Sequence, residues 1–579
     1  MLSSIRPNQF VALRLPSDMT KLVELVPNTY GRFLGKYGSF PANQILGRPF
    51  YLTFEILDAP DEEGSVLRIV HAAELHAENL ISGGSGEADG EGDEAEMNGD
   101  DGAMRSNRDI VDTRSTQKLT LDEIEELKRE SAGAGREIVA KLLESHSAID
   151  QKTAFSLAKY TLRKRKKYIK RFTALPVDVS LLTNYMLYEK DAPRIMELRD
   201  ELVGLIGCWG NVHHGGNLPA EATLPSKPNG RYLVVDETGG LVVAAMAERM
   251  GILYPGEAEA EAEAEGENIN AEQQPSSKQP QARPTAPHLS RPQPMSASGN
   301  SITVLHAHAT PSLALLKYFG YDQDSPDHSH PLYTHLKSVS WMQLVDPESD
   351  PIYTNEPPVI PDSELATYKA NKRSGYYRKR NRWARVRSAV DESRAGGFDG
   401  LIVASAMEPA SIMKHVIPLL SGAAPVVMYS PTVEPLAELA ELYSTPRRAA
   451  YINRKRELEE RARQQSTPGE SEEPNPNSSE AQAGDLSELE ENFPVDPTLL
   501  LAPTLQTSRV RPWQVLPGRT HPMMSGRGGA EGYIFHATRV LPARDSIQAG
   551  GSSRKRRKVG TVQAPNSSIG GSVDMEMKT

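Results

Sequence analysis

The sequence predicts an α+β and α/β protein in three parts: a small antiparallel β domain, a helical connector and an α/β domain. Up to residue 71, short β-rich runs alternate with turn residues, a spacing typical of a small barrel or sandwich. Amphipathic helical stripes follow. Beyond residue 176, apolar runs alternate with helical patterns, as an α/β sheet requires. The expected parts are listed by range: β domain 1–80, flexible acidic insertion 81–106, connector 107–176, α/β domain 177–545 and disordered tail 546–579.

Charge is unevenly distributed along the 579 residues. The chain carries 65 Lys and Arg against 76 Asp and Glu, a net charge of -11. Eight carboxylates lie in residues 87–101 and six in residues 257–267, and removing these fourteen negative charges from -11 leaves +3. The acidic balance therefore describes the insertions and not the folded part. We expect further polar, disordered insertions near residues 255–300 and 463–491, which are too polar to bury a core.

Several protein classes are excluded by what the sequence lacks. Its apolar stretches are short or broken by proline, so no transmembrane helix is expected. Residues 1–20 lack the basic start and apolar block of a signal peptide. A single cysteine, Cys208, excludes an intrachain disulfide and a thiolate zinc cluster. A reducing intracellular compartment fits this composition.

In the first two parts, turn residues and apolar stripes define the elements. Strands are expected at residues 10–15, 32–36, 50–57 and 66–71. In the connector, Thr120 and Glu123 form a capping box, which satisfies free backbone donors at a helix start. Ile138, Leu142 and Leu143 form the apolar stripe of a second helix. A third helix is expected from about residue 152 into a basic segment.

In the α/β part, continuous apolar runs predict buried strands. They lie at residues 231–236, 302–306, 399–405 and 426–430. Helices are expected at residues 239–250 and 312–319, and others start near residues 408 and 434. Residues 505–515 and 533–540 are expected to close the sheet as an antiparallel pair.

Residues 231–251 have the strand, turn and helix order in which an α/β enzyme places a nucleotide cofactor. Such a turn needs glycines where the backbone approaches the ligand and open amides at the helix start. Only Gly239 and Gly240 are present, and no G-x-G-x-x-G or G-x-G-x-G spacing exists. A working cofactor site remains an alternative, but the pattern favours a structural or RNA-facing turn.

The basic segment, residues 159–172, is the strongest binding signal. It carries eight bases in fourteen residues, with Tyr160, Tyr168 and Phe172 between them. Bases neutralise phosphates and aromatic rings stack on exposed nucleobases. A solvated helix face or a nuclear import signal is the alternative. We favour RNA binding, because eight like charges along one helix repel one another unless a polyanion is near.

Other motifs carry weaker signals. A second basic stretch at residues 369–387 holds nine bases together with Tyr376, Tyr377 and Trp383, and either RNA contact or a solvated helix explains it. His213, His214, His306 and His308 have no carboxylate or cysteine at ligand spacing, so a metal site is not expected. Ser312, Ser405 and Ser430 lie outside G-x-S-x-G turns, which removes support for a hydrolase nucleophile. The cluster RKRRK at residues 554–558 is typical of a nuclear import signal.

Read together, several segments resemble the non-catalytic subunit of the eukaryotic tRNA (adenine-58-N1) methyltransferase. The resemblance rests on NQILGRPF at residues 43–50, QKLT at 117–120, KTAF at 152–155 leading into the basic segment, VVDETGG at 234–240 with AMAERMG at 245–251, and QVLPGRTHP at 514–522 with Gly532, Tyr533 and Ile534. These matches span most of the expected ordered chain in the right order.

The resemblance implies a β-barrel domain followed by a Rossmann-like methyltransferase fold whose S-adenosylmethionine site has decayed. It implies a catalytic paralogue as partner, commonly with two copies of each subunit in a heterotetramer, and the RKRRK cluster predicts that this complex lies in the nucleus. The partner would hold S-adenosylmethionine and a catalytic Asp, while the flipped adenine attacks the methyl group through its N1. DGLIVASAMEP at residues 399–409 agrees, because its residues 404–407 offer no carboxylate or aromatic of the kind that adenine-nitrogen methyltransferases place after the fourth strand. Glu408 could serve as a base, but an exposed helix-start glutamate is the favoured interpretation.

In this assignment the chain has no catalytic, cofactor-binding or metal-binding residues and supplies contacts to tRNA. The expected contact residues are Asn107, Arg108, Lys159, Tyr160, Arg163, Lys164, Arg165, Lys166, Lys167, Tyr168, Arg194, Glu237, Thr238, Gly239 and Gly240. Two alternatives remain: an active methyltransferase with an unusual cofactor loop, and an RNA-binding module of the translation or transcription machinery.

Overall fold

The computed structural model describes residues 4–17, 19–31, 39–58, 65–75, 123, 135–146, 160–161, 164–165, 167–214, 230–254, 300–466, 489, 491–511, 513–516, 519–522 and 530–541. Residues up to Val540 form one unit. The expected acidic insertion, most of the capping box, the strand at residues 32–36 and the tail lie outside the described residues.

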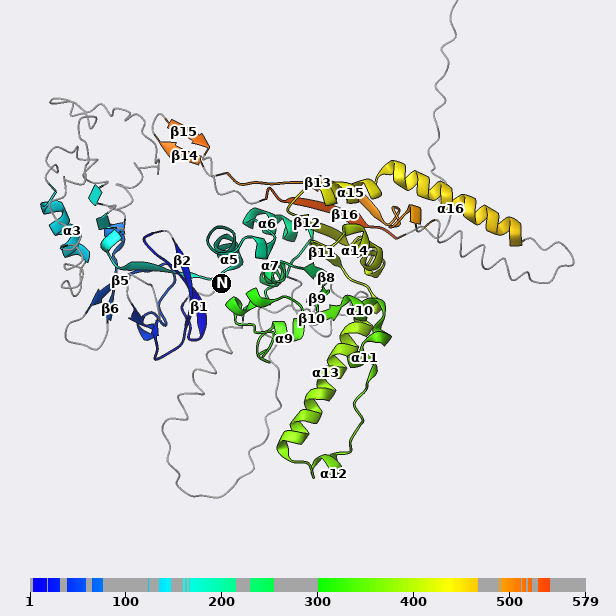
Figure 1. Ribbon diagram of the computed structural model, residues 1–579, viewed down its shortest axis with the longest axis horizontal. Coiled ribbons are helices and arrows are strands. Elements are labelled where there is room, and N and C mark those ends of the chain that lie inside the picture. Colours follow the sequence, from blue (N-terminus) through cyan, green and yellow to red (C-terminus); the bar gives the residue numbers. More distant parts are fainter. Residues whose placement is uncertain are drawn as a thin grey trace, which may run out of the picture. The chain divides into compact units, whose positions relative to one another are not determined.

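A five-stranded antiparallel sheet contains the first strands of the chain (Figure 1). Its order is β2 (Thr20–Leu25), β1 (Gln9–Arg14), β7 (Arg171–Pro176), β5 (Thr53–Asp58) and β6 (Ser65–Ile69). β3 (Tyr30–Gly31) pairs with β4 (Phe40–Pro41), and the short helix η2 (Ala42–Gln44) follows. In the described residues the sheet is open, with β2 and β6 at its edges, so the expected closed barrel is not found.

The central position of β7 explains why the sheet is not built from the first 80 residues alone. β7 follows the connector, yet it pairs with β1 on one side and β5 on the other. Strands β1 and β7 bury side chains on both of their faces, which alternate along each strand. Val11 and Leu13 point into the core of this sheet, whereas Ala12 joins the core of the α/β part. The small sheet therefore packs directly on the α/β part, where Phe10 meets Tyr318 edge to face.

The connector contributes helix α3 (Gly135–Glu144) to the described residues. Ile138, Val139 and Leu142 are buried on one face of α3, which confirms two positions of the predicted stripe. Gly135 lies against the backbone of Tyr168, and a Cβ there would stand 2.1 Å from the Tyr168 carbonyl oxygen. Helix α3 and the end of the basic segment are thus in close contact.

A seven-stranded sheet forms the α/β part. Its order is β10 (Leu336–Ser340), β9 (Ser301–His306), β8 (Arg231–Asp236), β11 (Gly400–Ala404), β12 (Pro425–Ser430), β16 (Tyr533–Arg539) and β13 (Leu500–Gln506). The first five strands are parallel, and β16 is antiparallel to both β12 and β13. The four predicted buried strands are confirmed to within a residue or two, and β10 is an addition.

Helices cover both faces of this sheet, as its parallel strands require. Tyr232 and Val234 of β8 pack into one core with α5 (Val179–Tyr185), α6 (Asp200–Trp209) and α7 (Leu241–Met250). Leu233 and Val235 pack into the opposite core with α14 (Pro409–Val416), α15 (Glu434–Leu442) and the end of α13 (Ala370–Ala395). This alternation produces a doubly wound, three-layer arrangement.

Of the two strands predicted to close the sheet, the second is confirmed as β16, whereas the first lies a few residues earlier than predicted, as β13. β16 pairs with residues 500–506, and residues 513–516 form β14 (Trp513–Leu516), which pairs with β15 (Arg519–Pro522). The other elements are η6 (Met186–Lys190), η7 (Pro193–Ile195), η8 (Ala314–Phe319), α9 (Leu332–His335), α10 (Trp341–Val345), η9 (Pro347–Ser349), α11 (Pro351–Thr354), α12 (Asp362–Leu365), η10 (Ile417–Leu419) and α16 (Thr445–Ser466). No helix of the described residues is long and apolar enough to cross a membrane.

Candidate RNA interface and the closed cofactor turn

The strand order places the ligand end of an α/β sheet between β8 and β11. These strands are neighbours, although β9 and β10 lie between them in the sequence. In doubly wound sheets, ligands bind outside the carboxyl ends of the strands, where the strand order reverses. The turn after β8 and the loop after β11 both leave from this edge, so they define the position of a possible cofactor site.

The two loops are hydrogen bonded to each other across this edge. The Glu237 N–H donates to the Ala404 carbonyl at 2.8 Å. The Ala406 N–H donates to the Glu237 carboxylate at 2.8 Å. Glu237 therefore uses both its backbone and its side chain to join the end of β8 to the loop after β11.

Asp236 satisfies the amides that a cofactor turn would offer to its ligand. Its buried carboxylate accepts hydrogen bonds from the Thr238 N–H at 2.7 Å, the Thr238 hydroxyl at 2.5 Å and the Val243 N–H at 3.0 Å. The Gly240 N–H adds a further hydrogen bond, and the Val242 N–H donates to the Thr238 hydroxyl oxygen at 3.2 Å. Burial raises the pKa of Asp236, and these hydrogen bonds oppose the increase. An anion at a helix start needs such amides, and here side chains of the turn itself occupy them.

Two leucines from the segment after β9 cover the same turn. The Leu315 N–H donates to the Gly239 carbonyl at 3.0 Å, and a Cβ at Gly239 would lie 3.5 Å from the Leu315 side chain. A Cβ at Gly240 would lie 3.0 Å from the Leu313 Cα. The glycines thus serve close packing of the chain on itself, and the residues present do not fit a nucleotide-type cofactor.

The loop after β11 carries no catalytic arrangement. The Ser405 hydroxyl accepts a hydrogen bond from the Met407 N–H at 3.0 Å. Glu408 is exposed and precedes α14 without a side-chain cap, as predicted for a helix-start residue. The loop therefore supports the turn of β8.

Of the predicted RNA contacts at the β8 turn, two side chains face solvent. Thr238, Gly239 and Gly240 are buried, because the turn is packed under Leu313 and Leu315 and hydrogen bonded to Asp236. Glu237 is exposed. Arg194, also exposed, has its Nε 3.9 Å from the position of a Gly239 Cβ. The expected contact by the three buried residues conflicts with their burial, whereas Arg194 and Glu237 remain accessible.

The described residues of the basic segment up to Tyr168 are helical. Tyr160, Thr161, Lys164, Arg165, Lys167 and Tyr168 have helical backbone, and Arg165 and Lys167 are exposed. Lys164 lies over the Tyr160 ring at 4.9 Å and Lys167 over the Tyr168 ring at 5.5 Å. Tyr160 also meets His146 edge to face. The remaining predicted contacts, Asn107, Arg108, Lys159, Arg163 and Lys166, lie outside the described residues.

The last two residues of the basic segment have structural roles that the sequence interpretation missed. Phe172 is buried in the small sheet, stacked on Phe40 and Phe54 with centroids 4.6 and 5.5 Å apart, so it does not stack on RNA. Arg171 is also buried, and its guanidinium lies 3.4 Å from the Glu74 carboxylate. β7 begins at Arg171, so the two side chains point to opposite faces of the sheet, and both are buried.

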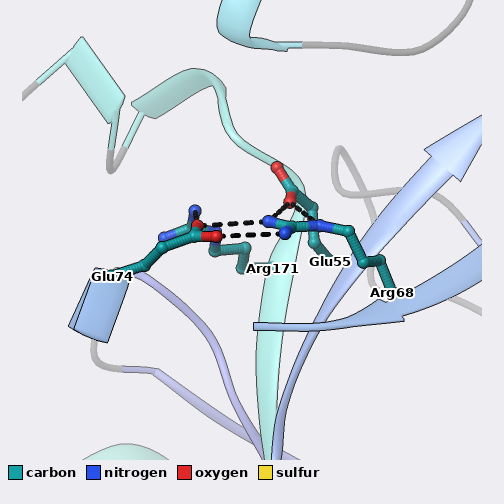
Figure 2. Close-up of polar contacts among 4 residues, drawn as sticks. All are labelled: Glu55, Arg68, Glu74 and Arg171. Atoms are coloured by element: carbon teal, nitrogen blue, oxygen red, sulfur yellow. Dashed lines mark hydrogen bonds and ion pairs between the residues drawn. The ribbon is translucent and has the colours of Figure 1, made fainter. Parts of the chain in front are cut away.

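Figure 2 shows the cluster that holds Arg171. Glu55 faces Arg68 on one side and Arg171 on the other in the strand register. Arg68 donates to Glu55 from Nε at 3.0 Å and from Nη2 at 2.5 Å, and to Glu74 from Nη1 at 3.0 Å. Hydrogen bonds to Glu74 and then Glu55 raise the pKa of Arg68. This ion-pair cluster joins three strands and the helical residues 72–75, which carry Glu74.

The histidines do not form a metal site in the described residues. His213 Nδ1 lies 2.6 Å from the Asn211 carbonyl, and His306 Nδ1 lies 2.7 Å from the His308 carbonyl. Among the described side chains, no group of three or more His, Cys, Asp or Glu is placed to hold a metal ion. The nearby carbonyls explain the positions of these imidazoles.

The strand order and the filled turn define a class: a Rossmann-like α/β protein whose cofactor edge is closed by its own side chains. The Gcd10p family model matches residues 4–369. This match covers more than half of the 579 residues, and the chain belongs to the Gcd10p family.

Curated relatives carry one name. The chain is 65% identical to the tRNA (adenine(58)-N(1))-methyltransferase non-catalytic subunit trm6 of Aspergillus fumigatus, over 100% of both chains. It is 62% identical to the protein of that name from Aspergillus oryzae, also over 100% of both, and 27% identical to that of Schizosaccharomyces pombe, over 95% of this chain and 94% of the relative. Among solved structures, it matches a SAM-dependent O-methyltransferase from Thermotoga maritima at 9% identity and a TM-score of 0.35, over 94% and 97% of the chains.

Proposed function

We propose that this chain is the non-catalytic subunit of a tRNA N1-methyladenosine-58 methyltransferase and that it positions tRNA for a catalytic partner. The observation that carries the proposal is the closed turn after β8. Asp236 and Thr238 occupy the helix-start amides, and Leu313 and Leu315 cover the glycines. Full-length identity to relatives of that name supports the same role.

S-adenosylmethionine, in this proposal, is bound by the partner. That subunit supplies the methyl donor and the catalytic residues, whereas this chain supplies RNA contacts and shape. Two copies of each subunit make up the assembly. The basic cluster at residues 554–558, which lies outside the described residues, directs the complex to the nucleus.

RNA binding rests on the basic segment together with Arg194. Lys164, Arg165 and Lys167 lie on a helical stretch of backbone, anchored where Ile169 and Phe172 are buried. If about six basic residues reach phosphates, raising the salt concentration from 50 to 200 mM weakens tRNA binding by roughly a thousandfold. Binding that is insensitive to salt would contradict a phosphate-contacting role.

Copurification and activity test the whole assignment. The chain is purified alone and together with its methyltransferase-like partner, and both samples are assayed for methyl transfer to tRNA. The proposal expects transfer by the pair and none by the chain alone. If the chain purifies without such a partner, it is instead an RNA-binding module of another machinery.

A further inference from the structure

Helix α13 is the second strongly basic element of the chain, and the family match does not reach it. The match ends at residue 369, and α13 begins at Ala370. Residues 370–388 contain eight Lys and Arg and no Asp or Glu. The first acidic side chains of the helix are Asp391 and Glu392, in the part that packs on the sheet.

The side chains on one face of α13 pack against the rest of the protein, and most of its other side chains are exposed. The Tyr376 hydroxyl lies 3.1 Å from the Ile360 N–H, which donates to it, and 3.1 Å from the Pro358 carbonyl. The Trp383 Nε1–H donates to the Tyr353 carbonyl at 3.3 Å. These contacts hold α13 against the segment from α11 to α12 (Figure 1), and the buried Ala389 and Val390 pack its end into the core of the large sheet.

Four cations of α13 face solvent without a carboxylate partner among the described residues. They are Arg373, Arg378, Lys379 and Arg382. Others are occupied: Arg387 pairs with Asp391 at 3.1 Å, and Arg385 lies over the Tyr333 ring at 4.8 Å. Arg378 and Arg382 are one turn apart, about 6 Å along the axis. Tyr377, which precedes Arg378 in the sequence, is 43% exposed, and its ring offers a stacking surface.

Helix α16 shows how the same chain builds a solvated helix. α16 is long, and its described side chains are largely exposed like those of α13; in its second half, Lys455, Arg456 and Arg461 are mixed with Glu457, Glu459 and Glu460. Mixed signs reduce repulsion between neighbouring turns. The basic part of α13 lacks this mixture, so its like charges repel one another, and a bound polyanion would relieve this repulsion.

We propose that α13 is a second RNA-docking element, which binds the phosphate backbone of a structured RNA through Arg373, Arg378, Lys379 and Arg382. The proposal rests on the tRNA-binding role above and extends it to a surface that lies outside the basic segment. Charge complementarity selects RNA as the occupant.

The test uses the complete complex of this chain and its partner, with a triple variant, R378Q/K379Q/R382Q. The matched control, K455Q/R456Q/R461Q on α16, removes the same charge from a helix of mixed signs. The variant is expected to lower tRNA affinity on the order of a hundredfold at 0.15 M salt and to reduce the slope of log K against log salt by about 2 to 3. The control should change the tRNA affinity by no more than a few-fold and leave the slope of log K against log salt close to that of the wild type.

Equal effects of the two triple variants would overturn the proposal, because they would report net charge alone. A variant that impairs subunit assembly in size-exclusion chromatography but keeps its tRNA affinity would also overturn it, and would point to an acidic protein segment as the occupant. Circular dichroism and the maximal methylation rate at saturating tRNA check that the variant is folded. If the wild-type complex fails to methylate tRNA at all, the proposed function fails separately from the role of α13.

Discussion

Replacing Asp236 by alanine tests whether the turn after β8 is a structural closure. The substitution removes the acceptor of three backbone N–H groups, from Thr238, Gly240 and Val243, all of them buried. Each unpaired buried donor costs about 1–3 kcal/mol. Burial raises the pKa of Asp236, which shows that its buried charge is unfavourable. Removing that charge therefore offsets part of the cost of the unpaired N–H donors. We expect a net cost of about 3 kcal/mol, which makes local opening roughly a hundredfold more frequent.

Hydrogen exchange measured by mass spectrometry on the complex is the assay. In the D236A variant, the peptide covering residues 236–244 should lose protection by roughly that factor. The control is Asp399→Ala, which removes a carboxylate bonded to the Gly230 and Arg231 amides at the opposite end of β8. The control should expose residues 230–231 and leave the turn protected. Unchanged exchange at residues 236–244 in D236A would refute the assignment of the carboxylate as the closure of the turn.

Three further changes follow from the structure. Reversing the charges of Lys164, Arg165 and Lys167 should weaken tRNA binding by at least a hundredfold and leave partner assembly intact, measured by filter binding and size-exclusion chromatography. Replacing Glu55 by glutamine should lower the free energy of unfolding by about 2 kcal/mol in urea titrations, less than the roughly 3–5 of a fully buried pair, because the Arg68 side chain is 32% exposed. Burial lowers the pKa of His330, so its contribution to stability is present above the ordinary value of about 6.5 and is lost as the pH falls; H330Q should flatten the decline of the melting temperature between pH 7 and 5.

For each of these three variants, one result would contradict the prediction. Unchanged tRNA affinity in the charge-reversed variant would remove the basic segment from the mechanism. Equal stability of E55Q and wild type would show that the cluster in Figure 2 contributes little to the sheet. A pH dependence of melting that H330Q leaves as steep as before would assign the acid sensitivity to other groups.

The sequence predicted the parallel strands well because strands buried on both faces leave continuous apolar runs. β8 matches its predicted range, and β9 and β12 each begin one residue earlier than predicted. β7 was hidden because it starts inside the basic segment, and its partners β1 and β5 lie more than a hundred residues earlier. β10, with the sequence LKSVS, is too short and polar to give a strand signal.

The candidate site could be predicted only in part. The absence of a glycine-rich pattern at residues 231–251 favoured a structural turn, and in the structure Asp236 and Thr238 accept hydrogen bonds from the amides of this turn. The covering leucines, Leu313 and Leu315, lie more than seventy residues from Gly239 in the sequence, and nothing local indicates that contact. Arg171 and Phe172 look like part of a continuous basic helix, but the sheet pairing of β7 buries them on opposite faces of the small sheet.

The most direct test of the account is equilibrium dialysis of the purified chain against labelled S-adenosylmethionine, followed by addition of the catalytic partner and tRNA. The account predicts no binding by the chain alone at donor concentrations that saturate the pair, and methyl transfer once the partner is added. Stoichiometric binding, or methylation of tRNA by the chain alone, would contradict it.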